Sequence, residues 1–353
     1  MAKEVRKVRV WKSADTSHIL TIKGRMTNKV SVIIVNWNGE PFLERCLTAL
    51  MAQTVKPHEI ILVDNASSDE SVEIVRRFPS VRLIALDRNT GFAQGNNLAI
   101  AAASAESEWI ALINPDAFAE PYWLEALLEA EACNPEFDVF SSKLINAGDP
   151  TLLDGAGDAY HVSGLAWRMG HGYPVSIFVE NEREVFSPCA AAALYRRSAL
   201  RKIGGFDEDY FCYVEDVDLG FRLRLVGYRC LHVPQSVAHH VGSGTTGGQD
   251  SDFAMYHGHR NLVWTFVKDM PSILFWLLLP LHVSLNLASI IWFALRRRRG
   301  GVIWRAKRDA FVGLPKMWRK RQQIQKTRVA SIGEIWRQLD KLMITTKLGR
   351  KEI

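Results

Sequence analysis

Runs of β-branched residues alternate along the first third of the chain with segments whose apolar residues recur at helical spacing. Residues 30–35 and 59–63 are apolar runs of strand length, and polar residues follow each run. Between them, residues 41–53 gather apolar side chains on one helical face, and Pro41 occupies a first turn, where a helix tolerates proline. The pattern predicts buried parallel strands joined by helices.

The alternation continues as far as residue 113. Residues 81–86 read as a third strand, a helix rich in alanine opens at Gly91, and another apolar run covers residues 109–113. Ser67 and Glu70 have the spacing of a capping box at the start of a further helix. Strands that alternate with helices predict an α/β nucleotide-binding fold, in which ligands bind at the carboxyl ends of the strands.

Carboxylates occur at two places in otherwise apolar surroundings. Asp116 follows the apolar run that ends at residue 113, and the segment Glu215-Asp216-Val217-Asp218 holds three carboxylates within four residues. Such charge is costly to bury unless a metal ion or a reacting proton uses it. With Asn36 and Asp64 at the ends of earlier strands, Asp116 marks the expected ligand-binding edge of the sheet.

The order of six motifs resembles that of the family-2 inverting glycosyltransferases with a GT-A fold. The motifs are VSVIIVNWNG, ILVDNASSDES, RNTGFAQGNN, LINPD, GGFDEDYFCYVEDVDLGFRLRLVGYR and HHVGSGTT. They are most similar to those of bacterial rhamnosyltransferase-like members that build cell-surface polysaccharide, and the resemblance covers residues 29–265. It implies a Rossmann-like domain with a mixed central sheet. It also implies metal-assisted transfer of a sugar from a nucleoside diphosphate donor.

The resemblance assigns a first group of residues to the donor. Asp64 would contact a pyrimidine base, although an aspartate that caps a helix through an Asx turn has the same sequence pattern. Asp69 also suits the first turn of a helix whatever the protein does, because the helix dipole favours a carboxylate there. The glycines of the third motif would equally suit an ordinary loop into a helix. The remaining donor-binding candidates are Asn36, Asn38, Asn65, Arg88, Asn89, Gly91, Gly95, Asn97, Asn114 and Asp116.

A divalent metal is the cofactor that the resemblance implies. Many relatives carry an Asp-x-Asp motif where this chain has Asn114-Pro115-Asp116, so Asp116 must provide most of the protein's hold on the metal. A metal that also binds diphosphate needs few protein ligands, and one carboxylate with one histidine suffices. The expected second ligand is His240, ahead of His239, although a histidine at a strand end also suits a structural role. The expected ion is Mg2+ or Mn2+.

The catalytic candidates are Asp216 and Glu215. By resemblance, Asp216 is the general base that removes the proton of the acceptor hydroxyl, and Glu215 orients the acceptor or the base. Asp218 has a simpler role available, since it can cap a helix or pair with Arg222 four residues later. Clustered like charges are expected to raise at least one carboxyl pKa. A single displacement that uses one base inverts the anomeric configuration.

The acceptor-side candidates are Glu215 and three residues between the fourth and fifth motifs. They are Trp167, Arg168, Cys189 and Glu215, of which the first two lie in a glycine-rich stretch that a surface hairpin would also explain. Cys189 has neither a histidine partner nor metal-ligand spacing, which favours packing over a nucleophilic role. The five cysteines show no paired spacing, so a reduced, cytosolic setting is expected.

The composition changes in the last hundred residues. Residues 270–295 are apolar and long enough to span a bilayer. Residues 296–353 then contain 18 lysine and arginine residues against 4 aspartate and glutamate residues, a balance of +14. Because the whole chain carries +6, residues 1–295 carry −8. The basic charge is therefore concentrated in the tail.

This charge split predicts how the protein meets a membrane. A spanning segment with the tail in the cytoplasm would place the catalytic domain outside, away from its nucleotide sugars. We therefore expect a peripheral or monotopic protein at the cytoplasmic face of the bacterial inner membrane. A broken helix or helical hairpin would lie in the inner leaflet, with the tail on anionic headgroups. Nucleic acid is the rival partner for such charge, but no recognition motif accompanies it, and none is expected to bind.

The predicted organisation has three parts. Residues 1–28 form an N-terminal extension, residues 29–265 the GT-A catalytic domain, and residues 266–353 an apolar helical segment with a basic, membrane-associated tail. The extension lacks the apolar core of a signal peptide and forms either two short strands or a loose arm. The expected partners are a nucleoside diphosphate sugar and a lipid-linked or polysaccharide acceptor.

Two other functions stay open. A nucleotidyltransferase acting on a sugar phosphate shares the fold class, but no glycine-rich activation loop with lysine or arginine follows the first strand. A catalytically decayed membrane scaffold is the other alternative, because Asn114 replaces an expected carboxylate.

Overall fold

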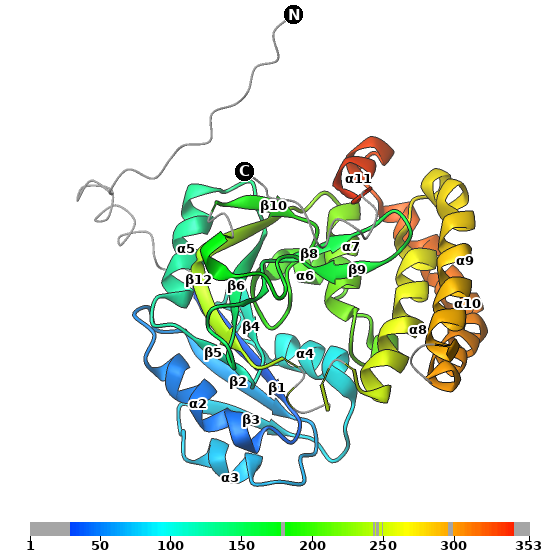
Figure 1. Ribbon diagram of the computed structural model, residues 1–353. Helices are drawn as coiled ribbons and strands as arrows, with labels where there is room; N and C mark the ends of the chain where they lie inside the picture. The colour runs from blue at the N-terminus through cyan, green and yellow to red at the C-terminus, as the bar shows by residue number, and fades with distance from the viewer. Residues whose placement is uncertain are drawn as a thin grey trace, which may run out of the picture.

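A mixed sheet of ten strands forms the centre of the part of the chain that the computed structural model describes (Figure 1). That part comprises residues 29–177, 181–242, 244, 247–248, 250–295 and 299–341. The predicted N-terminal extension, residues 1–28, lies outside it. The same holds for Ser243, Thr245 and Thr246 of the last motif, and for residues 296–298 and 342–353 of the basic tail.

The first half of the fold is the predicted alternation of parallel strands and helices. Its elements are β1 (Val30–Asn36), α2 (Glu40–Met51), β2 (Glu59–Asp64), α3 (Ser71–Arg76), β3 (Val81–Ala85), α4 (Gly91–Ala102) and β4 (Trp109–Ile113). The strands pair in the order β3-β2-β1-β4, all parallel. The order reverses between β1 and β4, and a crevice forms at such a point beyond the carboxyl ends of the strands.

Alternate residues of β1 enter different cores, as expected for a strand that is buried on both faces. Val32 and Ile34 pack with α2, α3 and α5 (Trp123–Cys133), while Ile33 and Val35 pack with α4, α6 (Arg197–Ile203) and α7 (Glu215–Leu225). The sheet therefore lies between two helical layers.

The predicted capping box at the start of α3 is wrong. The hydroxyl of Ser67 donates to Asp64 at 2.6 Å instead of capping the helix. The helix begins only at Ser71, without a side-chain cap.

The second half of the sheet runs in both directions, which confirms the predicted mixed sheet. Its strands are β5 (Ala117–Ala119), β6 (Val139–Asn146), β7 (Leu153–Gly155), β10 (Arg183–Val185), β11 (Ala192–Arg196) and β12 (Cys230–His240). β11 lies antiparallel between β4 and β6, and β12 is parallel to β6 but antiparallel to β5. His240 is opposite Ala117 in this last pairing, so its side chain lies beside Asp116.

A small hairpin and two short 3-10 turns complete this half. The glycine-rich stretch forms β8 (Asp158–Tyr160) and β9 (Ala166–Arg168), which pair antiparallel. The 3-10 turns are η1 (Val175–Ile177) and η2 (Glu208–Tyr210).

The C-terminal helices are α8 (Asp252–Asp269), α9 (Ser272–Leu295), α10 (Gly300–Thr327) and α11 (Ile332–Gln338). The apolar segment is one continuous helix that includes Pro280, so it is neither broken nor a hairpin by itself. The hairpin is made by α9 and α10 together. Near its turn the amide of Arg299 donates to Phe293, and farther along Trp276 contacts Trp318 with ring centroids 6.5 Å apart.

The helical region and the sheet domain share a third core. It combines Tyr160 and Phe221 with Phe266 of α8 and Met317 of α10. Lys268 at the end of α8 is fully buried, and it pairs with Asp207 at 2.6 Å and with Asp218. The helices are thus packed against the elements that carry the carboxylate cluster.

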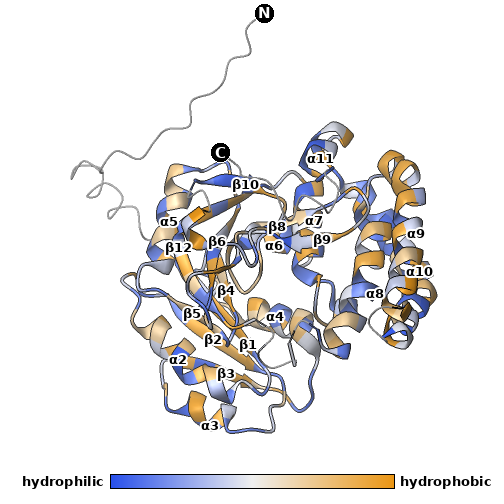
Figure 2. Ribbon diagram, in the orientation of Figure 1, coloured by the Kyte–Doolittle hydropathy of each residue, from blue (hydrophilic) through white to orange (hydrophobic). Residues whose placement is uncertain are grey.

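In the described part of the chain, α9 is the helix whose length and composition are sufficient to cross a membrane. Only 22% of its most apolar 18-residue stretch is buried by the rest of the protein. Figure 2 shows it as hydrophobic along most of its length. The predicted apolar segment is therefore present as a largely uncovered helix.

Candidate active site

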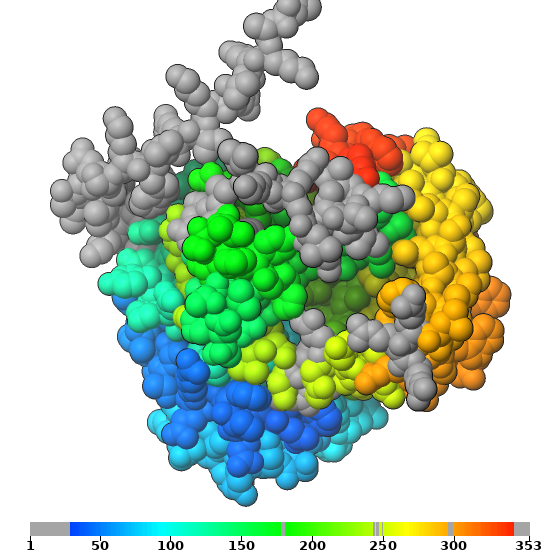
Figure 3. Space-filling model, in the orientation of Figure 1, coloured from blue at the N-terminus to red at the C-terminus, as the bar shows by residue number. Residues whose placement is uncertain are grey.

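A cavity of about 770 Å³ lies beyond the carboxyl ends of β1 and β4. The surface is hollowed between the β8–β9 side of the sheet domain and the helices α8 and α9 (Figure 3). The predicted site residues that line it are Asn65, Asn89, Gly91, Asn114, Asp116, Trp167, Arg168, Cys189, Glu215, Asp216 and His240. These residues are distributed along the sequence from the end of β2 to the end of β12. The fold therefore brings most of the candidates together in one cavity.

Seven donor-binding candidates do not line this cavity: Asn36, Asn38, Asp64, Asp69, Arg88, Gly95 and Asn97. Asp64 is buried and accepts hydrogen bonds from Asn36 at 2.9 Å and from the amide of Ser67 at 2.9 Å. The second bond closes a turn in the loop before α3, and Asp64 does not cap that helix, which begins at Ser71. Its contact with a base stays a prediction.

Several of these residues have evident structural partners. Asn97 donates to the carbonyl of Phe206 at 2.9 Å, which fixes α4 against η2. A Cβ atom on Gly95 would lie 2.7 Å from a methyl group of Val35, so close helix–strand packing requires glycine there. These contacts explain the residues without a ligand.

Asn65 and Gly91 shape one edge of the cavity. The Asn65 side chain accepts from the amide of Thr90 and donates to the carbonyl of Gly91, both at 3.0 Å. Gly91 has φ +86°, and a Cβ atom there would lie 2.6 Å from the Phe211 ring. The loop into α4 is therefore fixed by an asparagine and needs a glycine.

Asp116 and His240 face each other across a possible cation position. Asp116 Oδ1 lies 3.3 Å from His240 Nε2. Two ligand atoms bound at about 2.1 Å and at right angles are about 3 Å apart, so this spacing suits a shared divalent cation. The other nitrogen, His240 Nδ1, lies 2.7 Å from Asp154. A carboxylate behind the ligating histidine is the usual arrangement in metal sites.

The carboxylates around His240 favour a positive charge between Asp116 and the imidazole. Although burial opposes ionisation, the hydrogen bond and charge of His240 lower the pKa of Asp116. Burial likewise works against a charged His240, but Asp116 and Asp154 raise its pKa to about 9. A bound cation would take the place of the proton on Nε2.

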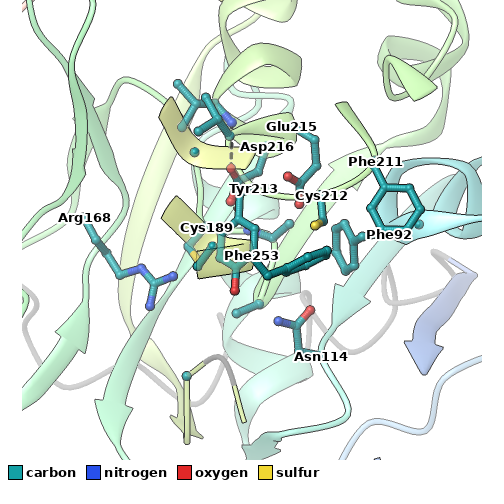
Figure 4. Close-up of a pocket in the computed structure, with 18 of the residues that line it drawn as sticks. Phe92, Asn114, Arg168, Cys189, Phe211, Cys212, Tyr213, Glu215, Asp216 and Phe253 are labelled. Carbon is teal, nitrogen blue, oxygen red and sulfur yellow. Dashed lines mark hydrogen bonds between the residues drawn. The ribbon is translucent and has the colours of Figure 1, made fainter. Parts of the chain in front are cut away.

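Asn114, the residue in place of the expected carboxylate, offers a further oxygen. Its Oδ1 is buried and has no hydrogen-bond partner among the described residues, and the side chain lines the cavity (Figure 4). No group of three or more histidine, cysteine or acidic side chains with metal-binding geometry occurs within the described ranges. The side chains that could bind a cation here are thus Asp116 and His240, with the amide oxygen of Asn114 in the same cavity.

Asp154 was not among the predicted site residues, although it begins the glycine-rich stretch. Besides His240, it forms an ion pair with Arg168 and lies 3.5 Å from His171. It is 2% exposed. One buried carboxylate therefore holds three basic groups that line the cavity.

Glu215 and Asp216 open α7 and point into the cavity from the side opposite Asn114 (Figure 4). Burial and the charge of Asp216 raise the pKa of Glu215 well above its usual range, and burial raises that of Asp216. Asp216 accepts the amide of Ala190 at 3.2 Å and that of Val217 at 2.8 Å. One hydrogen bond to each oxygen leaves acceptor capacity on both. The predicted rise in a carboxyl pKa is confirmed.

Asp218 has the structural role and does not reach the cavity. It pairs with Arg222 at 2.8 Å, four residues later, and with the buried Lys268. Asp158, which the sequence reasoning did not single out, is a further carboxylate that lines the cavity. Burial and the charge of Asp216 raise the pKa of Asp158 well above its usual range.

The backbone before Glu215 is strained. Positive φ angles of 64°, 63° and 69° occur at Phe211, Tyr213 and Val214. Residues other than glycine rarely adopt such angles, least of all β-branched valine. The buried amide of Asn261 donates to the carbonyls of Tyr210, Cys212 and Tyr213 at 3.0, 2.9 and 2.7 Å. Asn261, which was not predicted, thus fixes this turn from α8, and strain of this kind is typical of functional sites.

The acceptor-side candidates divide into two kinds. Trp167 and Arg168 project from the β8–β9 hairpin into the cavity, so the hairpin is both a surface element and a wall of the site. Cys189 is 4% exposed, and burial raises the pKa of its thiol well above its usual range, which fits packing. The five cysteines are free. His239 points elsewhere and contacts Glu120 at 3.0 Å.

Comparison with known sequences gives a consistent result. Residues 31–204 match the family described as Glycosyl transferase family 2. The chain is 32% identical over 254 residues to N-acetylglucosaminyl-diphospho-decaprenol L-rhamnosyltransferase of Mycobacterium tuberculosis (strain ATCC 25618 / H37Rv). The matched region covers 66% of this chain and 82% of that protein. It is 31% identical over 229 residues to the O-antigen biosynthesis protein RfbC of Myxococcus xanthus, which covers 61% of this chain and 18% of that protein.

Solved structures show the same architecture. The mannosyltransferase PcManGT from Pyrobaculum calidifontis, in complex with GDP-Man and Mn2+, has a TM-score of 0.51 at 18% identity, covering 91% of this chain and 94% of that one. GalNAc-T7 with UDP, GalNAc and Mn2+ has a TM-score of 0.54 at 17% identity, covering 68% of this chain and 48% of that one. These likenesses confirm the predicted GT-A fold.

Proposed function

The chain belongs to glycosyl transferase family 2, and from this premise we propose that it transfers L-rhamnose from dTDP-rhamnose, with inversion, to a lipid-linked or polysaccharide acceptor. The product would serve cell-surface glycan synthesis. The similarity to a rhamnosyltransferase with a lipid diphosphate acceptor supports the choice of sugar and acceptor. The observation that carries the proposal is the cavity itself, with the Glu215–Asp216 pair on one side and the Asp116–His240 pair on the other.

Asp216 is the general base of the proposed reaction. Its carboxylate takes the proton of the acceptor hydroxyl while that oxygen forms a bond to the anomeric carbon. The bond from the anomeric carbon to the diphosphate breaks, and its electron pair leaves with the diphosphate. Because the attack and departure occur on opposite faces of the sugar, the configuration inverts. Glu215, whose Oε2 is buried without a partner among the described residues, is placed to form a hydrogen bond with a hydroxyl group of the acceptor.

Groups on the side of the cavity opposite Asp216 would neutralise the negative charge of the donor. Asp116 and His240 would hold a divalent cation, Mg2+ or Mn2+, which would neutralise charge on the leaving diphosphate. Asn114 provides an amide oxygen beside them, and Arg168 adds a cationic group to the cavity wall. These side chains orient the donor so that the anomeric carbon faces Asp216.

The reaction would take place at the cytoplasmic face of the inner membrane. The proposal is supported by the largely uncovered α9 and by the basic tail that follows it. We propose that α9 lies in the interface rather than across it, with anionic headgroups next to the tail, since nucleotide sugars are on the cytoplasmic side.

A donor screen tests this function. The purified protein should turn over dTDP-rhamnose in preference to other nucleoside diphosphate sugars. It should need Mg2+ or Mn2+ and should give a product of inverted configuration by NMR. Asp216→Asn should retain nucleotide binding but lose transfer by ~100-fold or more, because only the base is removed. Turnover of none of the donors would support the scaffold alternative, and a near-parental rate in Asp216→Asn would exclude Asp216 as the base.

A further inference from the structure

The cavity has two chemically different walls. Its polar wall carries the acidic, amide and basic groups described above. The other wall comes from the start of α4, from the segment before Glu215 and from α8 and α9; it includes Phe92, Phe211, Phe253, Gly258, Leu262 and Phe293. Figure 4 shows the rings of Phe92, Phe211 and Phe253 across the cavity from Arg168. This second wall, the apolar wall, exceeds what a sugar or a diphosphate needs.

A glycine within α8 leaves room along the apolar wall. Gly258 lines the cavity, and a Cβ atom built on it would meet no atom of the described residues within 4 Å. Glycine inside a helix is destabilising, and no side chain or backbone in the described part of the chain requires it here. His259 beside it adds no charge, since burial and the nearby Lys307 lower its pKa to about 4. The position is open, uncharged and directed at the site.

The apolar wall continues to the outside of the molecule through α9. Phe293 lines the cavity and contacts His259 with ring centroids 5.2 Å apart. Its neighbours Ile291, Trp292 and Leu295 are 58%, 53% and 76% exposed. Phe293 therefore connects the apolar wall to a helix whose other side chains at this end are apolar and exposed.

We propose that the apolar wall binds the hydrocarbon chain of a polyisoprenyl diphosphate acceptor, next to its diphosphate. This inference rests on the proposed function and adds the site that distinguishes a lipid-linked acceptor from a free polysaccharide. A chain embedded beside α9 enters along Phe293, passes Gly258 and Leu262, and presents its saccharide to Asp216. A polysaccharide would leave these side chains uncovered.

Kinetics with two acceptors test the proposal. The acceptors share one saccharide diphosphate, carried either on a long polyisoprenyl chain or on a short water-soluble alkyl chain, and detergent micelles replace the membrane. Gly258→Leu fills the open position, and Phe293→Ser removes an apolar contact. Each should lower the ratio of kcat/KM for the long chain to that for the short chain by about tenfold, as expected when a leucine-sized apolar contact is lost.

Two matched variants provide controls. Gly333→Leu makes the same change in α11, where a Cβ atom also meets none of the described atoms within 4 Å and the residue lies outside the cavity. Ile273→Ser removes a 65% exposed side chain at the far end of α9. Neither should alter the ratio. An equal ratio in Gly258→Leu, Phe293→Ser and the parent would overturn the proposal.

A binding experiment separates this inference from the proposed function. A polyisoprenyl diphosphate with a diazirine in its first isoprene unit should label peptides of α8 and residue 293 in the parent, and label them less in Gly258→Leu. If no donor and acceptor pair is turned over but this labelling occurs, the proposed reaction is wrong and the chain site stands. Labelling confined to other segments would rule out the chain site, whatever the enzyme transfers.

Discussion

At the scale of single residues, the chemistry depends on two acidic neighbours that are difficult to ionise together. Glu215 and Asp216 are adjacent and directed at the same cavity, Glu215 is buried and Asp216 half-buried, and the pKa of each is raised. Two such carboxyls titrate as a pair, so that the first proton is lost more readily than the second. One member can therefore act as base while the other retains its proton and donates a hydrogen bond.

The acidic limb of the pH–rate profile reports this pair. Asp216 must be ionised to act as base, and its pKa is raised, so kcat/KM should begin to fall at a higher pH than an exposed aspartate, of pKa about 3.9, would give. Glu215 keeps its proton while Asp216 ionises, so the neutral Glu215→Gln should leave the limb in place. Initial rates across an acidic pH series measure the limb in both proteins. A limb that moves to lower pH in Glu215→Gln would show that Glu215, and not Asp216, loses its proton first.

Asp154 is expected to act through His240 and not on the substrate. Asp154→Asn keeps the size of the side chain but weakens its hold on His240 and Arg168, so Mn2+ affinity in the presence of nucleoside diphosphate should fall by ~10–100-fold. Electron paramagnetic resonance of free Mn2+ measures this without turnover. Asp149→Asn, which changes an exposed aspartate that bonds to Thr151 at 2.6 Å, is the control. Equal Mn2+ affinity in both variants would leave Asp154 with a packing role.

The sequence identifies residues whose role is local, and misses those whose role depends on distant partners. Asp116 and Asp216 were recognisable because each lies in a short motif, and His240 because it ends a strand. Asp154 contacts His240 across 86 positions, and nothing in the spacing of its own segment reveals that pairing. Asn261 was missed for the same reason, since its partners are carbonyl groups, which every residue has.

At the scale of elements, α8 holds the strained turn that positions the carboxylates. Asn261→Ala removes three hydrogen bonds to backbone carbonyls, which should reduce the free energy of unfolding by about 1–3 kcal/mol. It should also lower kcat by ~100-fold, since small displacements of catalytic groups are costly. Asn286→Ala in α9 is the control, because that amide bonds to His282 within its own helix at 2.7 Å. A normal kcat in Asn261→Ala would show that the turn holds its conformation unaided.

The elements themselves were predictable where packing follows a simple period. The strands β1 to β4 and the helices α2 and α4 were expected from β-branched runs and helical spacing, since both faces of this sheet are covered. The start of α3 was not, because Ser67 uses its hydroxyl on Asp64 instead of the helix. The continuity of α9 through Pro280 was also missed. The antiparallel strands are short and pair across long separations, and no local pattern fixes their order.

Two lysines on the same network should differ greatly in their effect on stability. Lys268→Met leaves Asp207 and Asp218 buried without their shared cation, and should lower the free energy of unfolding by about 3–5 kcal/mol. Lys316→Met removes a 55% exposed partner of Asp209 and should lower the free energy of unfolding by about 1 kcal/mol or less. Urea unfolding measures both. Similar losses in the two variants would contradict a buried network.

The same network predicts an acid dependence of stability. Lys268 and Lys320 hold the pKa of Asp207 well below its usual range, against the effect of burial. Ionised Asp207 therefore stabilises the fold fully above about pH 3.9, the pKa of an aspartate in the unfolded chain. This stabilisation is lost as the pH falls toward the lower pKa of Asp207 in the folded protein. Lys268→Met should remove much of this acid-dependent part.

At the scale of the whole molecule, the α9–α10 face and the basic tail should act together on a membrane. Binding to vesicles with anionic lipid should weaken in high salt, because lysine and arginine each contribute about 1 kcal/mol near the surface before screening. A salt-resistant part should remain from the apolar face of α9. Replacing both Trp276 and Leu277, which are 63% and 65% exposed, with serine should reduce that part in a flotation assay.

Tyr122→Ser controls for the loss of an exposed apolar side chain, since Tyr122 is 64% exposed and directly precedes α5, which lies across the sheet domain from α9 (Figure 1). It should bind vesicles like the parent. The interfacial arrangement also predicts that protease added outside sealed, right-side-out vesicles leaves the C-terminal tail intact. Cleavage of the tail from outside would show that α9 spans the bilayer.

The pairing of Asp340 with β8 has a consequence for biosynthesis. The amide of Asp340 donates to Tyr160 at 2.8 Å, and its carbonyl accepts from Val162 at 2.9 Å. At ~5–20 residues per second, the ribosome needs roughly 10–40 s to proceed from Tyr160 to Asp340. During that interval the hairpin that carries Trp167 and Arg168 has an unpaired edge, and exposed edges attract other strands. We therefore expect the nascent chain to be most vulnerable to aggregation shortly before its active cavity is complete.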